Sequence, residues 1–404
     1  MKNTRLLRCI LLILFLVGCG KDPQDSPSTE SAESYVLTLP PEDHNQGFQG
    51  MPFVETPEGY YYKYGNLICF CARGTNDFYP ICSKPECSHE DEDCNAWCSG
   101  TSFGYYKGAL YNYRRIATTD GAQPALDVIK RNLDGTDHQV VATLHGDWLG
   151  FFGTLFHRGK LYIYGTTGNT LEEQKNHLIA FDLSDHSQTE LAADFFGENL
   201  NTVFVTFYKD KLYGTVDFGG VGSQPKFEDC RVMELDLNTG ELQTLASDFP
   251  ALMYATDTSL YYLGEDPVHY ANLLGYEPEE MGTAEPRGFR ECNLNTGEIK
   301  NCGLPVEDST SALYDENYIY VNGNWEGKGV DFRQTLYILT RDYQLVDRIE
   351  LKGAGLAYVT SDRLFFHRNE GFYWPIIYSL EKSKIGSQEL ILESVETHAP
   401  QEWK

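Results

Sequence analysis

Short runs of alternating apolar and polar residues cover most of the chain, and tight-turn sequences separate them. Alternation with a period of two is typical of a β-strand with one buried face. One phrase recurs where such runs begin: a turn residue, then an apolar and an aromatic residue, as in Gly159-Lys-Leu161-Tyr162 and Asp210-Lys-Leu212-Tyr213. Each copy predicts a turn that leads into a strand. Further copies begin near Gly108, Thr258, Glu316 and Asp362, and a weaker first copy begins at Gly65.

A second phrase alternates with the first and consists of a strand that runs into a tight turn. Its clearest copies are Met233-Glu-Leu-Asp-Leu-Asn-Thr-Gly-Glu241 and Arg290-Glu-Cys-Asn-Leu-Asn-Thr-Gly-Glu298, and others begin at Ile129, Ile179 and Tyr337. Asn-Thr-Gly and Asp-Gly suit hairpins because glycine adopts positive φ without steric cost. Each unit of roughly 40 to 50 residues therefore contains two hairpins, or four strands.

Four-stranded units at this period predict an all-β fold, a β-propeller. We count seven blades that start near residues 53, 102, 150, 203, 251, 310 and 355. Six or eight blades stay open, because the first blade is short and a strand from either chain end would complete it and lock the ring. The alternative is a pair of β-sandwiches, but sandwiches rarely repeat one phrase along a whole chain.

Composition supports β-structure and narrows the choice of partners. The chain has 27 Tyr and 22 Phe against 5 Met, and its 37 Gly supply turns. Its formal net charge of -27 disfavours nucleic acid and contact with anionic lipid through the protein surface. We expect a monomer with no nucleic-acid partner.

The N-terminus has the anatomy of an export signal. Lys2, Arg5 and Arg8 precede the apolar run from Ile10 to Phe15, which is too short to span a bilayer. The following Leu16-Val17-Gly18-Cys19 resembles the lipobox of bacterial lipoproteins. The resemblance implies cleavage before Cys19, a diacylglyceryl group with palmitate-type acyl chains on Cys19, and a lipid-anchored protein that faces the outside of the cell membrane. Simple secretion is the alternative.

The sequence divides into four parts. Residues 1–18 form the signal peptide, and residues 19–34, rich in Ser, Pro and acids, form a disordered tether that starts at the lipidated Cys19. Residues 35–394 form a single propeller domain with a Cys-rich segment at 69–98, and 395–404 form a C-terminal tail.

The Cys-rich segment contains the most specific internal motif, Cys82-x4-Cys87-x-His89-x4-Cys94. Its Cys-x-Lys-Pro-x-Cys-x-His stretch resembles a signature of uncharacterised β-propeller lipoproteins of Gram-positive anaerobic bacteria. The match covers about fifteen residues, and the rest of the chain resembles those proteins only in repeat style. The resemblance implies the fold and the location of the protein but no activity.

Two chemistries suit these cysteines, and free thiols are the third possibility. Cys82, Cys87, His89 and Cys94 form a Cys3His set that would hold a structural zinc ion. An exported domain usually oxidises its thiols, so disulfides Cys69–Cys82 and Cys292–Cys302 across hairpins are the competing prediction. The mature chain has nine cysteines besides Cys19, so at least one thiol stays unpaired within the chain. No cofactor is required by any other motif.

The sequence contains neither the catalytic motif of a serine hydrolase or metalloprotease nor a phosphate-binding loop or dinucleotide-binding fingerprint. Binding is therefore favoured over catalysis. The long connections between second and third strands of the blades should emerge on one face, and we expect their aromatic and polar residues to bind a glycan, peptide or protein. The residues proposed for this face are Tyr270, Trp325, Asp331, Arg333, Tyr373 and Trp374. The alternative is a cell-envelope glycan hydrolase or lyase whose carboxylates the sequence does not locate.

Overall fold

The computed structural model describes residues 53–100, 102–116, 124–147, 151–167, 175–193, 201–217, 230–248, 250–264, 287–306, 309, 311–326, 333–368, 375–387 and 390–399. The chain divides into two compact units, Met1–Val36 and Leu37–Lys404, and every described residue belongs to the second. The signal peptide and the lipidation site at Cys19 therefore lie outside the described residues.

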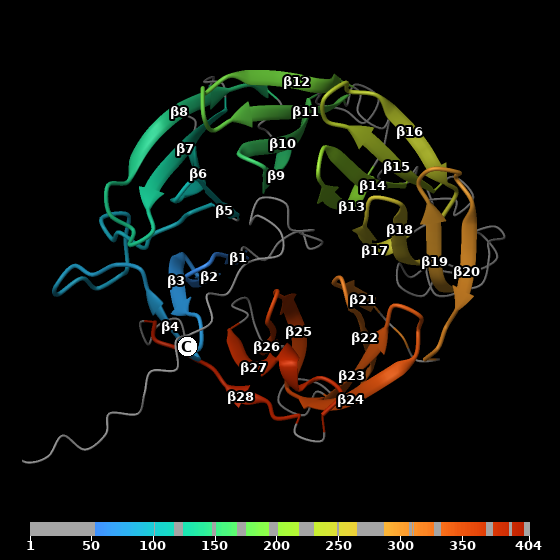
Figure 1. Ribbon diagram of the computed structural model, residues 1–404. Helices are drawn as coiled ribbons and strands as arrows, with labels where there is room; N and C mark the ends of the chain where they lie inside the picture. Colours follow the sequence, from blue (N-terminus) through green and yellow to red (C-terminus); the bar gives the residue numbers. More distant parts are fainter. Residues whose placement is uncertain are drawn as a thin grey trace, which may run out of the picture. The chain divides into compact units, whose positions relative to one another are not determined.

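Seven sheets, antiparallel except for one added strand in the first, stand in a ring and form a seven-bladed β-propeller (Figure 1). The blades begin at Phe53, Phe103, Phe151, Asn201, Pro250, Ser311 and Ala354. The predicted fold class and blade number are thus confirmed, and the alternatives of six or eight blades or two sandwiches are wrong. The described residues contain almost no helix, and the 3-10 turn that is described in full is Lys382–Lys384.

Each blade uses four consecutive strands, and the first strand lies toward the centre of the ring. Blades 1 to 4 comprise β1 (Phe53–Glu55), β2 (Gly59–Tyr64), β3 (Leu67–Ala72) and β4 (Asp77–Pro80); β5 (Phe103–Tyr106), β6 (Ala109–Ile116), β7 (Ala125–Asn132) and β8 (Gln139–His145); β9 (Phe151–His157), β10 (Lys160–Thr167), β11 (Lys175–Asp182) and β12 (Gln188–Ala193); and β13 (Asn201–Tyr208), β14 (Lys211–Asp217), β15 (Arg231–Asp236) and β16 (Leu242–Ala246). Blades 5 to 7 comprise β17 (Pro250–Ala255), β18 (Ser259–Gly264), β19 (Gly288–Asn293) and β20 (Ile299–Gly303); β21 (Ser311–Tyr314), β22 (Tyr318–Glu326), β23 (Arg333–Thr340) and β24 (Leu345–Lys352); and β25 (Ala354–Val359), β26 (Arg363–Arg368), β27 (Ile376–Glu381) and β28 (Glu393–Ser394).

In blades 3, 4 and 5 the two repeated phrases meet through one backbone hydrogen bond. In blade 3 the N–H of Leu183, from the second phrase, donates to the carbonyl oxygen of Gly159, from the first, at 2.9 Å. Leu237 makes the same bond to Asp210, and Leu294 makes it to Thr258. The leucine side chain of the second phrase is largely buried at Leu183 and Leu237. The phrases therefore recur together because their hydrogen bond joins the turn before the second strand to the turn after the third strand.

The turn residues agree with their backbone geometry. In blades 2 and 3 the first and second strands are joined at Lys107-Gly108 and Arg158-Gly159, and all four residues have positive φ. Two consecutive positive φ values are the requirement of the tightest hairpin turn, in which glycine carries the least strain. The apolar–aromatic pair that follows places one side chain on each face of the second strand.

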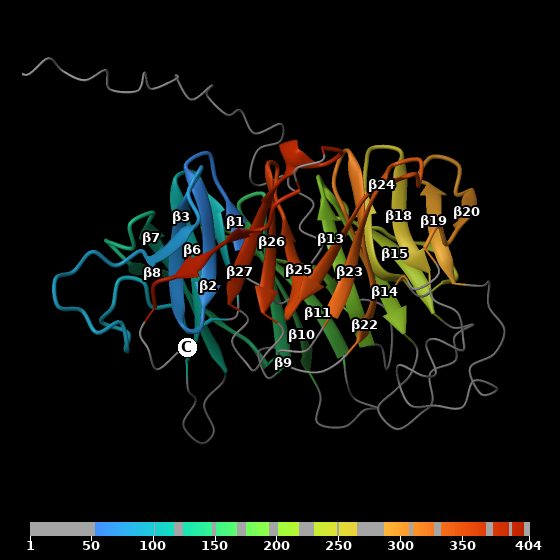
Figure 2. The same cartoon turned by 90° about the horizontal axis from the view of Figure 1, so that it is seen from below.

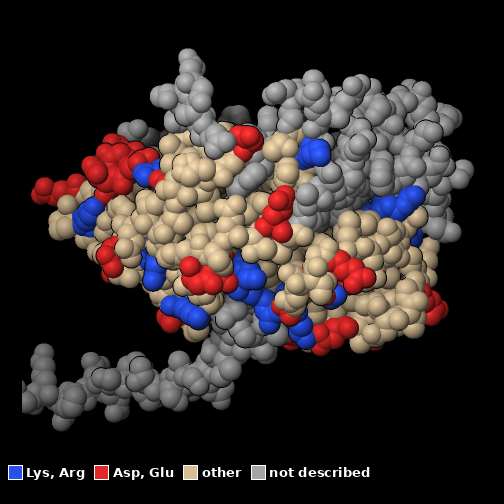
Figure 3. All heavy atoms as spheres, turned by 90° about the horizontal axis from the view of Figure 1, so that it is seen from above, with Lys and Arg blue, Asp and Glu red and all other residues tan. Residues whose placement is uncertain are grey.

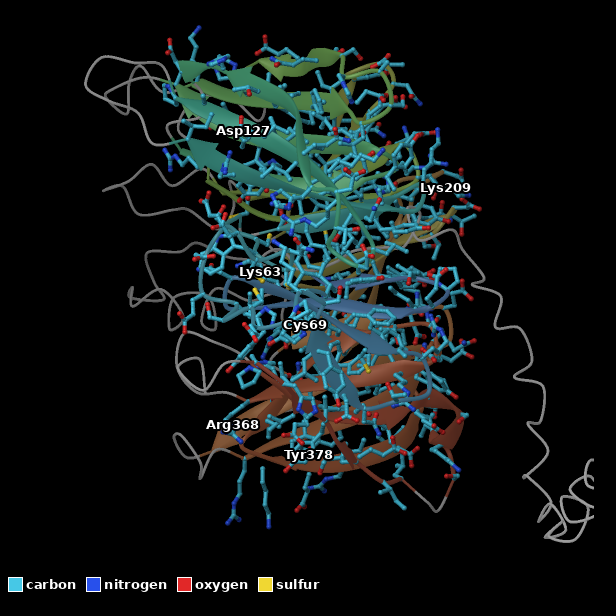
Figure 4. All side chains as sticks on the ribbon, turned by 90° about the vertical axis from the view of Figure 1, so that its left-hand side faces the viewer. Lys63, Cys69, Asp127, Lys209, Arg368 and Tyr378 are labelled. Atoms are coloured by element: carbon cyan, nitrogen blue, oxygen red, sulfur yellow. The ribbon has the colours of Figure 1, made fainter. Side chains whose placement is uncertain are left out.

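The two faces of the ring differ in their connections. Short turns join the first to the second strand of every blade, and in six blades the second strand leads into a long connection at the opposite face. Figure 4 shows this polarity: Asp127 and Arg368, next to such long connections, lie on one side, and Lys209, in a short turn, lies on the other. The long connections cover residues 117–124, 168–174, 218–230, 265–287, 327–332 and 369–375. We call their side of the ring the loop face.

Blade 1 departs from this pattern, and the sequence repeat is misaligned there. Gly65-Asn66, taken as the weak first copy of the first phrase, is the turn between β2 and β3. The equivalent of the phrase is the turn before Gly59, where the N–H of Thr56 donates to the Gly59 carbonyl at 2.8 Å, as Thr256 does to Ser259. The repeat was misaligned in blade 1 because Gly65-Asn66 has the composition of the other tight turns. Gly65 does form such a turn, with a positive φ of 58°. Blade 1 therefore has a two-residue turn where the other blades have long connections.

The C-terminal segment closes the ring. β29 (Glu396–Thr397) pairs in parallel with β4, with Glu396 opposite Asp77 and Thr397 opposite Phe78, so blade 1 has a fifth strand (Figure 2). A strand from the C-terminus thus joins the first blade, as expected, but blade 1 already has four strands of its own and did not need it for completion. Residues 395–404, expected to be a tail, thus include a strand of the propeller.

Side chains of blades 1 and 7 reinforce this closure. Arg73, in the turn after β3, pairs with Glu55 at 3.0 Å and with Asp362 of blade 7 at 2.8 Å. The hydroxyl of Tyr60 donates to Asp362 at 2.5 Å, and the N–H of Ser361 donates to Glu55 at 2.9 Å. We call Arg73, Glu55, Tyr60, Ser361 and Asp362 the closure network.

Within the described residues, no helix has the length and apolar character needed to cross a membrane.

Candidate metal centre

The part of the Cys-rich segment that follows β4, from residue 81, leads from blade 1 to the inner strand of blade 2, and both of its ends lie along β3. On the incoming side the N–H of Ile81 donates to the Ile68 carbonyl at 3.0 Å. On the outgoing side Ile68 donates to Ala96 at 2.8 Å, and Cys98 donates to Asn66 at 2.7 Å. The segment therefore covers the short β2–β3 turn of blade 1, and its middle projects outward from the ring (Figure 1).

Four donor groups meet in the projecting part. Cys82, Cys87, His89 and Cys94 each place one ligand atom so that all four atoms lie within 4.8 Å of one another. Nδ1 of His89 is 3.1 Å from Sγ of Cys94. Cys94 is buried, and the other three are half-buried. The structure thus brings together the complete set that the sequence motif predicted, and this set could hold one metal ion.

Backbone N–H groups point at two of the sulfur atoms. The N–H of Ala96 donates to Sγ of Cys94 at 3.3 Å. Burial alone would raise the pKa of the Cys82 thiol, but N–H groups of Lys84 and Asn95 stabilise its thiolate, and the net effect is a lowered pKa. Burial dominates at Cys94 and raises its pKa to about 12 in the absence of a metal. Such N–H donors are typical of the outer shell of a metal–thiolate site.

Blade 2 holds the segment through a buried arginine. Arg131 on β7 is 3% exposed and donates to the carbonyl of Asn95 and to Oδ1 of Asn112, each at 2.8 Å. Arg131 and Asn112 also line a small pocket of about 30 Å³ beside Cys94 and Trp97, which has room for about one water molecule. Because it is desolvated, Arg131 has a lowered pKa, which the nearby Cys98 and Cys94 thiols counteract.

The sequence interpretation missed Arg131 and Asn112, although the repeats contain a signal for them. At the position of Arg131 the second phrase has Phe181, Leu235, Cys292 and Leu339 in other blades, all buried. At the position of Asn112 the first phrase has Ile163, Tyr262, Val321 and Phe366 in blades 3, 5, 6 and 7. Blade 2 therefore has two polar residues at core positions of the repeat, and both face the Cys-rich segment.

Gly135 allows the segment to approach the β7–β8 turn closely. It has a φ of +78°, and a Cβ on it would lie 2.6 Å from the Asn95 carbonyl oxygen and 3.0 Å from Cγ1 of Ile81. No larger residue fits this contact without a shift of the backbone. The Cys-rich segment is thus packed against blade 1 on one side and blade 2 on the other.

The outer tip of the segment is acidic and exposed. Glu90, Asp91, Glu92 and Asp93 follow His89 and are all exposed, and the space-filling view shows acidic groups gathered at a projecting end of the protein (Figure 3). Arg114 of blade 2 connects to this tip by an ion pair of 2.9 Å with Glu92, and it pairs with Asp127 at the same distance.

The predicted disulfides are not formed. All nine cysteines from Cys69 to Cys302 are free thiols in the structure. Cys292 lies opposite Ile299 in the β19–β20 pair, three residues before Cys302, and Cys69 lies opposite Pro80, two residues before Cys82. Both hairpin registers therefore separate the cysteines that the sequence had placed face to face.

Most of the residues predicted to bind a ligand at the loop face lie outside the residues that the structure describes. Tyr270, Asp331, Tyr373 and Trp374 are not among the described residues, and for Trp325 only its place in β22 opposite Gln334 is described. Arg333 is exposed at the start of β23, at the edge of the loop face. The binding-site prediction for these residues stays untested.

A second group of metal-type donors lies at the closure strand. Asp77, Glu396 and His398 have ligand atoms within 4.8 Å of one another. Nε2 of His398 is 3.1 Å from Asp77, and its ring stacks on Tyr79 with centroids 4.2 Å apart. These contacts fix β29 against β4 without a metal, so we assign this group to ring closure.

The solved structures that the backbone resembles include a β-propeller domain. The backbone resembles a structure from a study of two prolyl endopeptidases, with 12% sequence identity and a TM-score of 0.49, over 87% of this chain and 49% of that one. It resembles the β-propeller domain of the Trilobed protease from Pyrococcus furiosus with 12% identity and a TM-score of 0.42, over 72% and 82% of the two chains. For an oligogalacturonate lyase from Vibrio parahaemolyticus the values are 10% and 0.39, over 70% and 84%.

These likenesses concern the fold alone, and we transfer no activity from them. No protein-family model matches the chain, and no curated protein sequence matches it.

Proposed function

We propose that the chain is a membrane-anchored lipoprotein whose propeller binds a glycan, peptide or protein outside the cytoplasmic membrane through its loop face. The observation that carries this proposal is the asymmetry of the ring. Six of the seven blades place a long connection between their second and third strands at the same face, and the connections at the other face are short turns except for residues 382–392 between β27 and β28. Connections on a rigid scaffold vary at low cost in stability and commonly carry binding residues.

The anchor supports the same proposal. Cleavage before Cys19 and its lipidation would leave a polar tether of about fifteen residues between the lipid and the propeller. Two acyl chains hold a protein stably at a bilayer. The propeller would then stand away from the membrane, and its net negative charge would disfavour contact with anionic lipid.

Charge narrows the chemistry of the partner. The acidic chain favours neutral or basic ligands and rejects nucleic acid. Arginines at the edge of the loop face, Arg333 and Arg368, are both exposed and offer hydrogen-bond donors beside the long connections. Figure 4 places Arg368 at the side of the ring from which these connections leave. A neutral glycan or an uncharged peptide fits this combination.

A binding screen tests the loop face. The full-length protein is applied to glycan and peptide arrays, and a variant with residues 265–287 replaced by a two-residue turn is compared with Asn295→Ala in a short turn of the same blade. We expect ligand binding to fall at least tenfold for the loop variant and to stay unchanged for Asn295→Ala. Equal binding by both variants to every ligand found would contradict the proposal. Release of reducing ends from a bound glycan would instead favour the hydrolase alternative.

Fractionation tests the anchor. The unchanged protein should sediment with membranes, and Cys19→Ala should appear in the soluble fraction or retain its leader. A Cys19→Ala protein that is cut at residue 18 and still sediments with membranes would overturn lipid anchoring.

A further inference from the structure

We propose that Cys82, Cys87, His89 and Cys94 bind one Zn²⁺ ion as a closed structural site that fixes the Cys-rich segment between blades 1 and 2. The proposal is independent of the loop face, since it concerns a different connection and a different chemistry.

The geometry of the donors fits a tetrahedral ion. With Zn–S bonds of about 2.3 Å and a Zn–N bond of about 2.0 Å, neighbouring donors in a tetrahedron lie roughly 3.5 to 3.8 Å apart. The four donor atoms already lie within 4.8 Å of one another, and Nδ1 of His89 is 3.1 Å from Sγ of Cys94. Small rotations of the side chains are enough to centre an ion among them.

The identity of the donors selects the metal. Three thiolates and one imidazole favour zinc, whereas calcium and magnesium require oxygen ligands. The carboxylates that follow, Glu90 to Asp93, point to no oxygen-rich site because they are exposed and outside the donor cluster. Their negative charge would attract a cation toward the site.

The outer shell is already in place on the protein side. The N–H group of Ala96 donates to Sγ of Cys94 at 3.3 Å. Asn95 is held by Arg131 through its carbonyl oxygen. Groups that orient metal ligands in this manner distinguish a built site from a chance cluster of cysteines.

The site is structural because four protein ligands leave no open position for a water or substrate. The segment also needs such a cross-link. Ser83, Lys84, Pro85 and Glu86 and the acidic tip are exposed, so residues 83–93 bury almost no apolar side chain of their own. An ion bound by Cys82 and Cys94 would join the two ends of this stretch where they meet blades 1 and 2.

Metal analysis of the full-length protein tests the proposal. We expect about one zinc per chain after purification without added metal, loss of zinc in Cys94→Ser and His89→Asn, and full zinc content in Cys302→Ser. Cys302 is a half-buried thiol outside the cluster, so its variant is a matched control. Asparagine at position 89 keeps a residue that tolerates the positive φ of 62° found there.

A second measurement does not depend on variants that fold. Cobalt added to the metal-free protein should produce a thiolate-to-metal charge-transfer band and tetrahedral visible bands that saturate at one ion per chain. Bound metal should protect Cys82, Cys87 and Cys94 from alkylation while Cys302 reacts equally with and without it. A disulfide between any two of the three cluster cysteines in the purified protein, or zinc retained by every variant, would overturn the site.

Discussion

Blade 1 is joined to its two neighbours in opposite ways. At blade 7 the joint consists of a paired strand, stacked rings of Phe53 and Tyr358 at 4.2 Å, and the closure network. At blade 2 the joint contains an irregular segment whose two ends pack Ile81, Ala96 and Cys98 into the core of blade 1 and bond to β3 and Arg131, but its middle, residues 83–93, has few apolar side chains. The first joint is complete with protein groups alone, whereas the second leaves four metal-type donors together. We infer that the irregular joint with blade 2 needs a cross-link, which the four donors can supply by binding a metal ion.

The largest expected effect is at the closure joint. Arg73→Ala leaves Glu55, whose side chain is 7% exposed, without its cationic partner. Removing one partner of a buried ion pair commonly costs roughly 3 kcal/mol or more. We expect a loss of about that size in the free energy of unfolding, measured by urea denaturation.

Arg158→Ala provides the matched control for the closure variant. Arg158 also connects neighbouring blades, through an ion pair of 2.6 Å with Asp210, but both side chains are at least a third exposed. We expect a loss below about 1 kcal/mol for this exposed pair. Similar losses for Arg73→Ala and Arg158→Ala would contradict the special role of the closure network.

The next largest effect on stability concerns the hydrogen bonds of Arg131, which hold the Cys-rich segment against blade 2. Arg131→Leu restores the apolar residue that the repeat has elsewhere but leaves the Asn95 carbonyl and Asn112 without a donor, which should cost roughly 2 kcal/mol. Adding Asn112→Ile should recover part of this loss, because the core of blade 2 then resembles that of blade 3. Further loss in the double variant would show that Asn112 acts apart from Arg131.

How much of this was visible in the sequence follows from these same residues. The ring, the blade number and the loop face were predictable because strand alternation and tight turns repeat along the chain, with the first phrase clear in six blades. The donor set was predictable because its members lie within thirteen residues. The joints were not predictable, since Arg73 and Asp362 are distant in sequence and meet only when the ring closes. The repeat also does not show which residue pairs with Cys69, because the strand pairing there ends at Pro80, two residues before Cys82. Arg131 was readable as a charged exception at a core position.

A smaller effect tests the close packing between the segment and blade 2. Gly135→Ala forces a Cβ against the Asn95 carbonyl, whereas Gly297→Ala adds a Cβ at a similar φ of +72° with nothing within 4 Å. Both variants pay for the left-handed backbone, about 1 kcal/mol. We expect Gly135→Ala to lower the melting temperature by several degrees more than Gly297→Ala. Equal decreases in melting temperature for the two variants would show that the Cys-rich segment moves away from the added Cβ without loss of stability.

The smallest effect provides a baseline distant from both joints. Asp236 accepts hydrogen bonds from Lys211 and from the N–H groups of Thr239 and Asn238, which lower its pKa to about 2. Its carboxylate therefore stabilises the fold above about pH 4, and this contribution is lost as pH falls toward 2. Asp236→Asn should lower stability slightly at pH 7, by less than about 1 kcal/mol, and not at pH 2.

The turn of Asp236→Asn should itself stay intact. Asn293 occupies the equivalent position in blade 5 and accepts the same two N–H groups, from Asn295 and Thr296. A loss of stability that is equal at both pH values would contradict the electrostatic explanation.

The most direct measurement is amide hydrogen exchange of the full-length protein with and without a zinc chelator, read at both joints of blade 1. The amides of Ile68 and Cys98 bond the Cys-rich segment to blade 1, and the amides of Glu396 and His398 bond β29 to β4. We predict that the chelator accelerates exchange at Ile68 and Cys98 at least tenfold and leaves Glu396 and His398 unchanged. Unchanged exchange at all four amides, or equal acceleration at both joints, would contradict a metal cross-link confined to the joint with blade 2.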